Sequence, residues 1–192
     1  ERYASYLRFF DDAAITQLTA EDSLPFDQMA AVFKGYFRSL DAVQAALATD
    51  RMMYLPNDLL TKVDRASMLH NLEVCSPFMD HELVQFAAGL SPDQLLRGGG
   101  KRMLREAFAA DLPAWVFKRK KMGFAVPIGD WFRGELRPML RDHLFATDSF
   151  ARGSFNMPVV ERLVEEHEQS RVDHSQRLYA LLMLELWWRN QK

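Results

Sequence analysis

The sequence predicts an all-α fold, an irregular bundle of roughly nine helices in one domain, and three observations lead to this expectation. Apolar residues recur at helical spacing in most segments, and capping residues and prolines separate these segments. No apolar–polar alternation of useful length indicates a strand. The 192 residues, 48% of them hydrophobic and 12% aromatic, suffice for one good core or at most two small ones.

The expected helices are joined by short turns. Asp41 and Asp80 each precede an apolar-periodic run and are expected to cap a helix. Pro56 with Asn57 is expected to end one helix and begin the next, because proline lacks the N–H that a helix interior needs. The segment 91–100 is expected to be a turn-rich linker and the only plausible internal boundary. The expected helices span 1–19, 27–40, 41–54, 57–69, 80–88, 101–110, 131–145, 157–171 and 174–190.

Charge is distributed unevenly along a chain whose net charge is only −2. Residues 97–121 hold eight basic and two acidic residues, and this block ends in the basic run 118–121. Such a block indicates an anionic partner, either phosphate or nucleic acid, although a solvated helix end has the same composition. The total charge excludes a histone-like polycation.

Cysteine content and hydropathy exclude further classes. The single cysteine, Cys75, excludes an internal disulfide framework and a four-cysteine zinc site. The most apolar stretch, 178–188, is 11 residues long and contains Glu185. Because a membrane-spanning helix needs about 20 apolar residues, a buried core helix is expected there instead.

Two short segments resemble known sites only in composition. Gly98 to Lys101 lacks the spacing of a phosphate-binding P-loop, and it is expected to be a flexible helix start whose free N–H groups can meet an anion. His167 lies among three glutamates in 165–168, where helical geometry spreads the side chains around the axis. A solvated helix face is therefore expected for His167, and no metal ligand is assigned.

Residues 55–80 contain charged groups at spacings that matter on a helix. On a helix that starts at Asp58, Lys62 and Arg65 lie along the same face, and Asp58 with Lys62 forms a simple i,i+4 pair. Asp64 points away from that face. Charged groups on both sides of a core helix indicate that some of them face inward, where a charge must be paired.

Two runs, DLLTKVDRASM at 58–68 and LEVCSPFMD at 72–80, resemble the C-terminal synthetase region of the glutamine-dependent asparagine synthetases. The resemblance covers roughly residues 45 to 190. Several separate motifs in register are far more specific than any one of them. The order and spacing also match at Lys120–Phe124, Val126–Ile128, Trp131 with Arg133–Leu136, and Leu182–Trp187.

The resemblance implies a fold and an activity. In that family a glutaminase domain frees ammonia from glutamine, and the synthetase domain uses ATP and Mg²⁺ to activate aspartate as β-aspartyl-AMP. Ammonia then displaces AMP to give asparagine. The family's pyrophosphate loop, Ser-Gly-Gly-x-Asp-Ser, does not occur in this sequence. The resemblance therefore implies that residues 1–192 are the C-terminal helical part of an adenine-nucleotide α-hydrolase-like (PP-loop) synthetase domain whose sheet part is missing, and that this fragment is inactive alone.

The resemblance also implies partners and a location. Aspartate, ATP and glutamine-derived ammonia are the expected reactants of the full enzyme, and ATP and Mg²⁺ are expected to bind mainly to regions absent from this chain. The chain is expected to pack on the missing PP-loop and glutaminase domains. A cytoplasmic location is expected, a membrane or nucleic-acid partner is not, and a homodimer is left open.

Site residues follow from the same resemblance. Lys121 corresponds to a lysine that reaches the ATP phosphates and steadies the charge that develops during adenylation. Lys120 and Gly123 belong to the same motif and are expected in nucleotide binding, with Gly123 in a loop where the backbone can approach a ligand closely. Glu73 matches a family glutamate and is a candidate for proton transfer. Arg65, with the neighbouring Asp64, is expected in internal ion pairs that shape the wall of the site.

The sequence also departs from the family pattern. Cys75 stands where the family usually has arginine, and Met79 stands where it has leucine. Loss of a cation at position 75 leaves open a paralogue that amidates another carboxylic acid. Two further alternatives are a helical nucleic-acid-binding module that uses the block 97–121 and a helical scaffold without chemistry.

Overall fold

The computed structural model describes residues 8–19, 34–120 and 126–191. Helices joined by short turns make up these residues, and no strand occurs among them, which confirms the all-α prediction. The chain divides into two compact units, one formed by 1–25 with 123–192 and the other by 26–122. These are called unit 1 and unit 2. The internal boundary predicted at 91–100 is therefore wrong.

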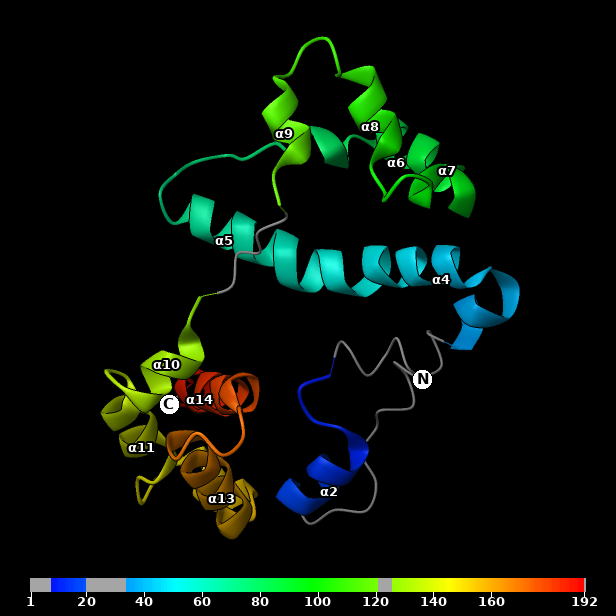
Figure 1. The fold of residues 1–192 in the computed structure, drawn as a ribbon. Helices are drawn as coiled ribbons and strands as arrows, with labels where there is room; N and C mark the ends of the chain where they lie inside the picture. Colours follow the sequence, from blue (N-terminus) through cyan, green and yellow to red (C-terminus); the bar gives the residue numbers. More distant parts are fainter. Residues whose placement is uncertain (1–7, 20–33, 121–125, 192) are drawn as a thin grey trace. The chain divides into compact units, whose positions relative to one another are not determined.

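Unit 1 is arranged around its last helix. The helix α14 packs against α10, α11, α12 and α13, while α2 packs against α13. The backbone N–H of Asn156 donates to the carbonyl of Leu18 at 2.7 Å, so two segments far apart in sequence are joined. The helices are α2 (Asp12–Thr19), α10 (Ile128–Arg133), α11 (Arg137–Leu144), α12 (Phe150–Ser154), α13 (Met157–Glu168) and α14 (Ser175–Arg189) (Figure 1).

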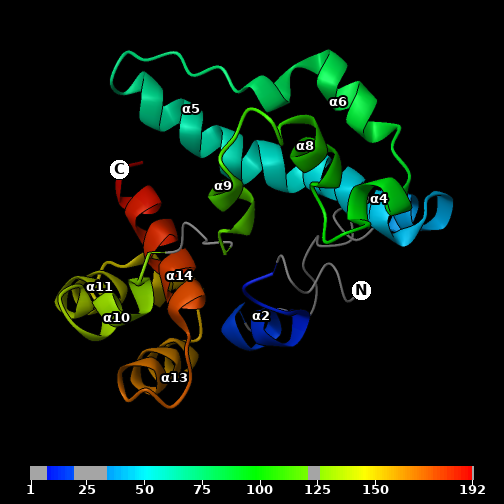
Figure 2. The ribbon, with the colours of Figure 1, turned by 45° about the horizontal axis from the view of Figure 1, so that its top comes forward.

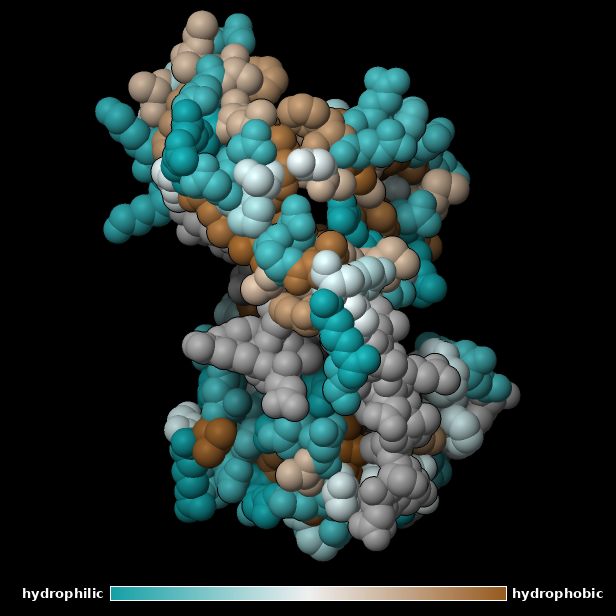
Figure 3. Space-filling model, turned by 90° about the vertical axis from the view of Figure 1, so that its right-hand side faces the viewer, coloured by the Kyte–Doolittle hydropathy of each residue, from teal (hydrophilic) through white to brown (hydrophobic). Residues whose placement is uncertain are grey.

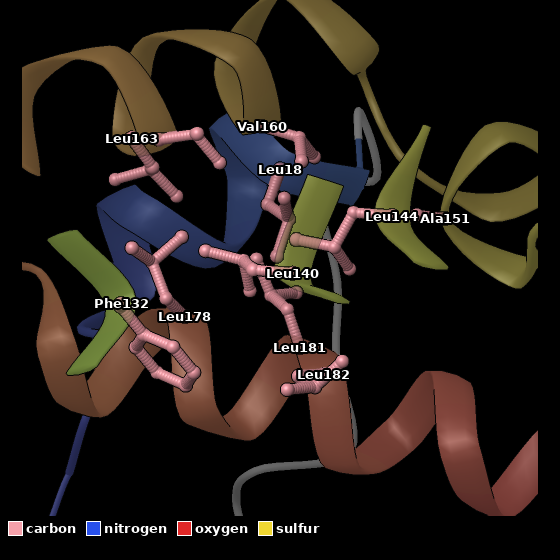
Figure 4. Close-up of a cluster of buried hydrophobic side chains, with 11 residues drawn as sticks. Leu18, Phe132, Leu140, Leu144, Ala151, Val160, Leu163, Leu178, Leu181 and Leu182 are labelled. Atoms are coloured by element: carbon pink, nitrogen blue, oxygen red, sulfur yellow. The ribbon is translucent and has the colours of Figure 1, made fainter. Parts of the chain in front are cut away.

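One apolar core holds unit 1 together. Leucines of α14 point toward leucine and valine side chains of α13 and toward Leu18 of α2 (Figure 4). The expectation of a buried helix near 178–188 is confirmed, since one face of α14 is buried. The core cluster comprises Leu18, Phe132, Leu140, Leu144, Ala151, Val160, Leu163, Val164, Leu178, Leu181 and Leu182.

The helix expected over 131–145 is two helices. Gly134 has a backbone far from helical values, with φ −112° and ψ −111°, and it ends α10. The carbonyl of Trp131 accepts from the N–H groups of Gly134 and Leu136, and α11 begins one residue later. The break turns the chain so that both short helices pack on α14.

Unit 2 contains a long continuous helix followed by short ones. Figures 1 and 2 both show α4 (Ala42–Thr49), the π-helical segment η1 (Asp50–Leu60) and α5 (Thr61–Met68) as one rod. The remaining elements are η2 (Pro77–Met79), α6 (His81–Ala88), α7 (Pro92–Leu96), α8 (Arg102–Ala107) and α9 (Ala114–Lys118).

The prediction that Pro56 ends a helix is wrong. A proline ring would clash with the carbonyl four residues earlier in an α-helix, whereas the wider π-turn separates these groups. Neighbouring side chains supply extra hydrogen bonds within this segment. The Asn57 amide donates to the carbonyl of Met53 at 2.8 Å, and the Thr61 hydroxyl donates to the carbonyl of Pro56 at 2.7 Å.

Side-chain caps define the starts of α4, α6 and α7 in unit 2. Asp41 accepts from the N–H groups of residues 43 and 44, and Asp80 accepts from those of residues 82 and 83, which confirms both predicted caps. The proposed linker 91–100 contains a helix, because Ser91 and Gln94 form a reciprocal capping box at the start of α7.

Unit 2 has almost no core of its own. Among its described residues only Ala45, Ala48 and Thr49 are buried. Large apolar side chains lie open to solvent, with Leu69 at 82% and Trp115 at 63% exposure. In the upper part of Figure 3, hydrophobic residues lie at the surface of unit 2. None of the described helices is long and apolar enough to cross a membrane.

Candidate functional site

Glu73 is exposed on a short connection whose two ends are fixed. The connection follows α5, where Asn71 takes a left-handed conformation with φ 54° and the N–H of Leu72 donates to the carbonyl of Ser67 at 3.0 Å. It runs into η2 and the capped start of α6. The Glu73 carboxylate lacks an ion pair or hydrogen bond within the described part of the chain. It is therefore open to solvent and to any ligand.

Lys120 is also exposed, two residues after the end of α9. Across residues 8–19, 34–120 and 126–191, the side chains of Lys118, Arg119 and Lys120 have no ion-pair partner. Lys121 and Gly123 lie outside the described residues, so their predicted roles stay predictions. Among the described site residues, no hydrogen bond or ion pair joins Glu73 to Lys120.

Three arginines of the basic block are bound to neighbouring groups. Arg97 pairs with Asp93 at 2.6 Å, and Arg102 pairs with Glu106 at 2.6 Å. Arg105 donates to the carbonyl oxygens of two glycines, that of residue 98 at 2.6 Å and that of residue 100. The cationic charge left without a partner in this block, as far as the structure describes it, is that of the lysines and of Arg119.

The glycine-rich turn before α8 differs from the flexible start that was expected. Residues 98 to 101 all have positive φ, at 71°, 88°, 76° and 53°. Glycine adopts this left-handed conformation without a steric cost, which is why three consecutive glycines fit here. Arg105 fastens the turn by binding its carbonyls, so the turn is ordered by its own helix.

The charged residues at 58–65 on the long helix of unit 2 only partly form the expected pairs. Asp58 and Lys62 form the predicted pair at 3.7 Å, with both side chains exposed. A hydrogen bond from Tyr54 to Asp58 raises the pKa of the Tyr54 phenol. Asp64 and Arg65 are exposed and lack an ion pair among the described residues. The expected internal pairing is therefore wrong within the described part of the chain, because both side chains are exposed to solvent there.

His167 is fully buried, so its predicted place on a solvated face is wrong. Its Nε2 lies 2.9 Å from the carbonyl of Gly129, and its Nδ1 accepts from the backbone N–H of His174 at 3.2 Å. Arg133 donates through Nε to the carbonyl of His167 at 2.9 Å. Burial lowers the pKa of His167, although the carboxylate of Asp173, 3.4 Å from Nδ1, opposes this shift. His167 therefore joins α13 to α10 and to the start of α14.

Charged groups surround this histidine. His174 contacts Glu166 at 2.7 Å, and this hydrogen bond lowers the pKa of the Glu166 carboxyl. Asp173 accepts from the N–H of Ser175 at 2.9 Å, which lowers the pKa of Asp173. No group of three or more described histidine, cysteine or acidic side chains is arranged to hold a metal ion.

Two other acidic residues of unit 1 have structural roles that the sequence did not reveal. Glu168 binds Arg141 with both carboxylate oxygens, at 2.7 and 2.8 Å, and also binds Arg137 at 3.0 Å. Glu185, 1% exposed, accepts from the N–H of Phe150 at 2.7 Å and from Arg189 at 2.8 Å. These contacts tie α11 to α13 and α12 to α14.

The described residues define an all-α protein with an exposed cationic run and with one helical unit in which few residues are buried. Comparison with known proteins gives the family. The family described as asparagine synthase matches residues 3–189. The chain therefore belongs to the asparagine synthase family.

Curated relatives agree with this assignment. The chain is 28% identical to asparagine synthetase (glutamine-hydrolyzing) 1 of Bacillus subtilis, over 97% of the chain and 30% of that protein. It is 32% identical to a Mycobacterium tuberculosis protein that bears the name asparagine synthetase (glutamine-hydrolyzing) provisionally, over 97% of the chain and 29% of that protein. The chain thus spans less than a third of the length of these relatives. No solved structure matches the chain.

Proposed function

We propose that this chain is the C-terminal helical part of an ATP-dependent amidotransferase that converts aspartate to asparagine with ammonia taken from glutamine. The observation that carries the proposal is the exposed cationic run Lys118–Lys120, which has no ion-pair partner in the described part of the chain and leads directly into Lys121. The family membership and the names of the curated relatives support it.

The proposed chemistry gives the cationic run a task. The β-carboxylate of aspartate attacks the α-phosphorus of ATP, the bond to the bridging oxygen breaks, and pyrophosphate leaves. Negative charge builds on the phosphate oxygens in this step, and a cation held there lowers the barrier. Lys121 is assigned this catalytic role, and Lys120 and Gly123 are assigned to nucleotide binding.

The second half of the reaction needs a base. When ammonia attacks the carbonyl carbon of β-aspartyl-AMP, the nitrogen must lose a proton before AMP departs with the bonding electrons. Glu73 is assigned this role, because its carboxylate is exposed and has no partner among the described residues. Mg²⁺ is assigned to parts of the enzyme outside this chain, since the described side chains offer no grouping that holds a metal ion.

The exposed apolar surface of unit 2 indicates where the rest of the enzyme binds. Exposed apolar patches of this extent mark interaction sites. The curated relatives are more than three times as long as the matched segment, so each contains polypeptide that has no counterpart in this chain. We propose that the PP-loop part of the synthetase domain packs on the exposed apolar surface of unit 2. We expect the fragment alone to have no amidation activity.

The test uses a full-length protein that carries this chain. With aspartate, ATP, Mg²⁺ and glutamine it is expected to form AMP and pyrophosphate, and Lys121→Ala is expected to lower the turnover by about 100-fold, as loss of a charge-stabilising group does in other enzymes. Lys34→Ala is the control, because it removes an exposed lysine that lies outside the cationic run. Unchanged turnover in Lys121→Ala would remove the assignment, and absence of both products would remove the proposed function.

One observation favours a second candidate. Cys75 is an exposed free thiol at the position where the family usually has arginine, on the same connection as Glu73. An amidotransferase for another carboxylic acid is therefore the alternative, and product formation with a different acid in place of aspartate identifies it. The nucleic-acid alternative is less well supported, because Arg97, Arg102 and Arg105 are engaged within unit 2.

A further inference from the structure

We propose that the connection between α13 and α14, residues 169–174, is an acid-sensitive latch that opens when His167 takes up a second proton. The imidazole ring of His167 is fully buried, and one of its nitrogens binds the backbone of this connection. Every group involved belongs to unit 1, and the latch acts whether or not the protein has the proposed activity.

The connection leaves α13 in a tight turn made by backbone hydrogen bonds. Ser170 takes a left-handed conformation with φ 56°. The carbonyl of Glu166 accepts from the N–H groups of Arg171 and Val172, at 2.9 and 3.3 Å. Residues 169–173 are exposed to solvent, so little packing holds them in place. Side-chain contacts therefore matter most where the connection enters α14.

Two side chains hold that end of the connection. The Nδ1 of His167 accepts from the backbone N–H of His174 at 3.2 Å. The carboxylate of Asp173 accepts from the N–H of Ser175 at 2.9 Å. Because a backbone N–H can only donate, Nδ1 must offer a lone pair, and the proton of the neutral ring is on Nε2. Nε2 then donates to the carbonyl of Gly129 at 2.9 Å.

The ring is held in place from the side of α10. A Cβ at Gly129 would lie 3.5 Å from Cε1 of His167 and 3.3 Å from the Cβ of Ser175, so the first turn of α10 packs closely on both. Arg133, one turn later, donates through Nε to the carbonyl of His167 at 2.9 Å. The exposed connection is therefore the part that yields when the ring changes its charge.

A second proton on the ring binds to Nδ1 and turns this nitrogen from an acceptor into a donor. Nδ1 then faces the N–H of His174, and two donors repel each other. Nε2 keeps its proton and its hydrogen bond to the carbonyl of Gly129. Protonation thus breaks the contact of the ring with the connection and leaves its contact with α10.

Charged groups face the ring from each element packed on it. Arg133 on α10, itself paired with Asp130 at 3.3 Å, lies 3.5 Å from Nδ1 and opposes the second proton. Asp173 in the connection lies 3.4 Å from Nδ1 and favours that proton. His174 opposes it, and the Nε2 of His174 binds Glu166 of α13 at 2.7 Å.

Burial is the main cause that lowers the pKa of His167, and it sets the direction of the pH effect. Because the pKa is lower in the folded state, the connection is fully stabilised above the unfolded pKa of about 6.5. Below that pH the open state, in which water reaches the ring, binds a proton that the closed state does not bind. The open population therefore rises about tenfold per pH unit until the folded pKa is reached.

Hydrogen exchange in a full-length protein that carries this chain tests the latch. Below about pH 6.5, amides of 169–177 are expected to lose protection by about tenfold per pH unit, after correction for the intrinsic rate. Amides of 159–164, in the buried part of α13, are expected to keep their protection over the same range. An equal loss in both segments, or no loss in 169–177, would overturn the proposal.

Three variants separate the latch from a merely structural role. His167→Gln removes the titrating group and keeps an amide that can donate to the Gly129 carbonyl, so it is expected to abolish the pH dependence. Asp173→Asn keeps an oxygen for the N–H of Ser175 but removes a charge that favours the second proton. The loss of protection is then expected to begin at lower pH.

His143→Gln is the matched control, because it removes a histidine of α11 whose Nδ1 contacts the carbonyl of Met139 in the same helix. This variant is expected to keep the pH dependence of the wild type. If His167→Gln does not fold, the shift in Asp173→Asn decides alone. A pH dependence that persists in His167→Gln, that does not move in Asp173→Asn, or that disappears in His143→Gln would overturn the proposal.

Discussion

At the scale of single residues, the neighbouring side chains of Glu166, His167 and Glu168 on α13 lie in different environments. Glu168 lies at the end of the helix with only 9% of its side chain exposed, and both of its oxygens bind Arg141. This hydrogen bonding lowers the pKa of the Glu168 carboxyl. Glu166 instead binds His174, and His167 between them is buried.

Glu168 is therefore expected to make stability depend on pH. Because its pKa is lower in the folded state, the stabilisation is fully present above the unfolded pKa of about 4.3 and is lost as the pH falls through the folded value. Glu168→Gln is expected to cost about 1–2 kcal/mol at neutral pH, since Arg141 is partly exposed, and less in acid.

Thermal unfolding of the chain at a series of pH values measures this effect. Glu161→Gln is the control on the same helix, because Glu161 is exposed and without an ion pair in the described part of the chain. If the melting temperatures of the Glu168 and Glu161 variants fall equally with decreasing pH, the role given to the Glu168–Arg141 pair is contradicted.

The spacing of apolar residues around His167 indicates a buried position, whereas the composition of its neighbours indicates a solvated one. Val160, Leu163, Val164 and His167 follow one another at the i, i+3, i+4, i+7 spacing of one helix face, and all four are buried. The three glutamates next to His167 in the sequence are typical of a solvated helix face. The hydrogen bond of His167 to Gly129 joins residues 38 positions apart in the sequence, so spacing on one helix does not reveal it.

At the scale of elements, the caps could be predicted and the breaks could not. Asp41 and Asp80 cap helices as expected, because a cap depends on a side chain and the next few backbone groups. Pro56 does not break its helix, because a π-turn with added side-chain hydrogen bonds accommodates it. Proline alone does not reveal which of these two solutions a chain adopts.

The link between α12 and α14 depends on one buried carboxylate. Glu185 accepts from the first N–H groups of α12, at Phe150 and Ala151, where the helix dipole favours negative charge. Glu185→Leu is expected to lower stability by about 2–3 kcal/mol, because a buried N–H loses its acceptor and the partly buried Arg189 keeps only its longer contact with Asp148. Glu185→Gln keeps an acceptor and is expected to cost less.

Chemical denaturation of these variants tests the link. Met183→Ala serves as the comparison, since Met183 lies on the exposed side of the same helix. If the leucine and glutamine variants unfold at the same denaturant concentration, the hydrogen bonds to α12 contribute nothing measurable.

At the scale of the whole molecule, the two units differ in kind. Unit 1 encloses a core of leucine, valine and phenylalanine side chains, while the buried residues of unit 2 that the structure describes are two alanines and a threonine. The apolar spacing along 57–69 and 80–88 correctly predicted helices there. Spacing does not reveal whether another element lies against the apolar face, so a shared core was expected where unit 2 has an open surface.

Unit 2 is consequently expected to need a cover from the rest of a full-length protein. In the chain alone, residues 34–120 are expected to exchange amide hydrogens rapidly and to bind an apolar dye, because burial of apolar area supplies most of the folding free energy. Addition of the remaining polypeptide is expected to suppress both effects. Phe86→Glu, at an exposed apolar position of α6, should weaken this protection, whereas Tyr179→Glu on the exposed face of α14 in unit 1 should not. A chain whose unit 2 is protected in isolation, with no gain from the added polypeptide, would contradict the proposed docking and would favour a self-sufficient helical scaffold.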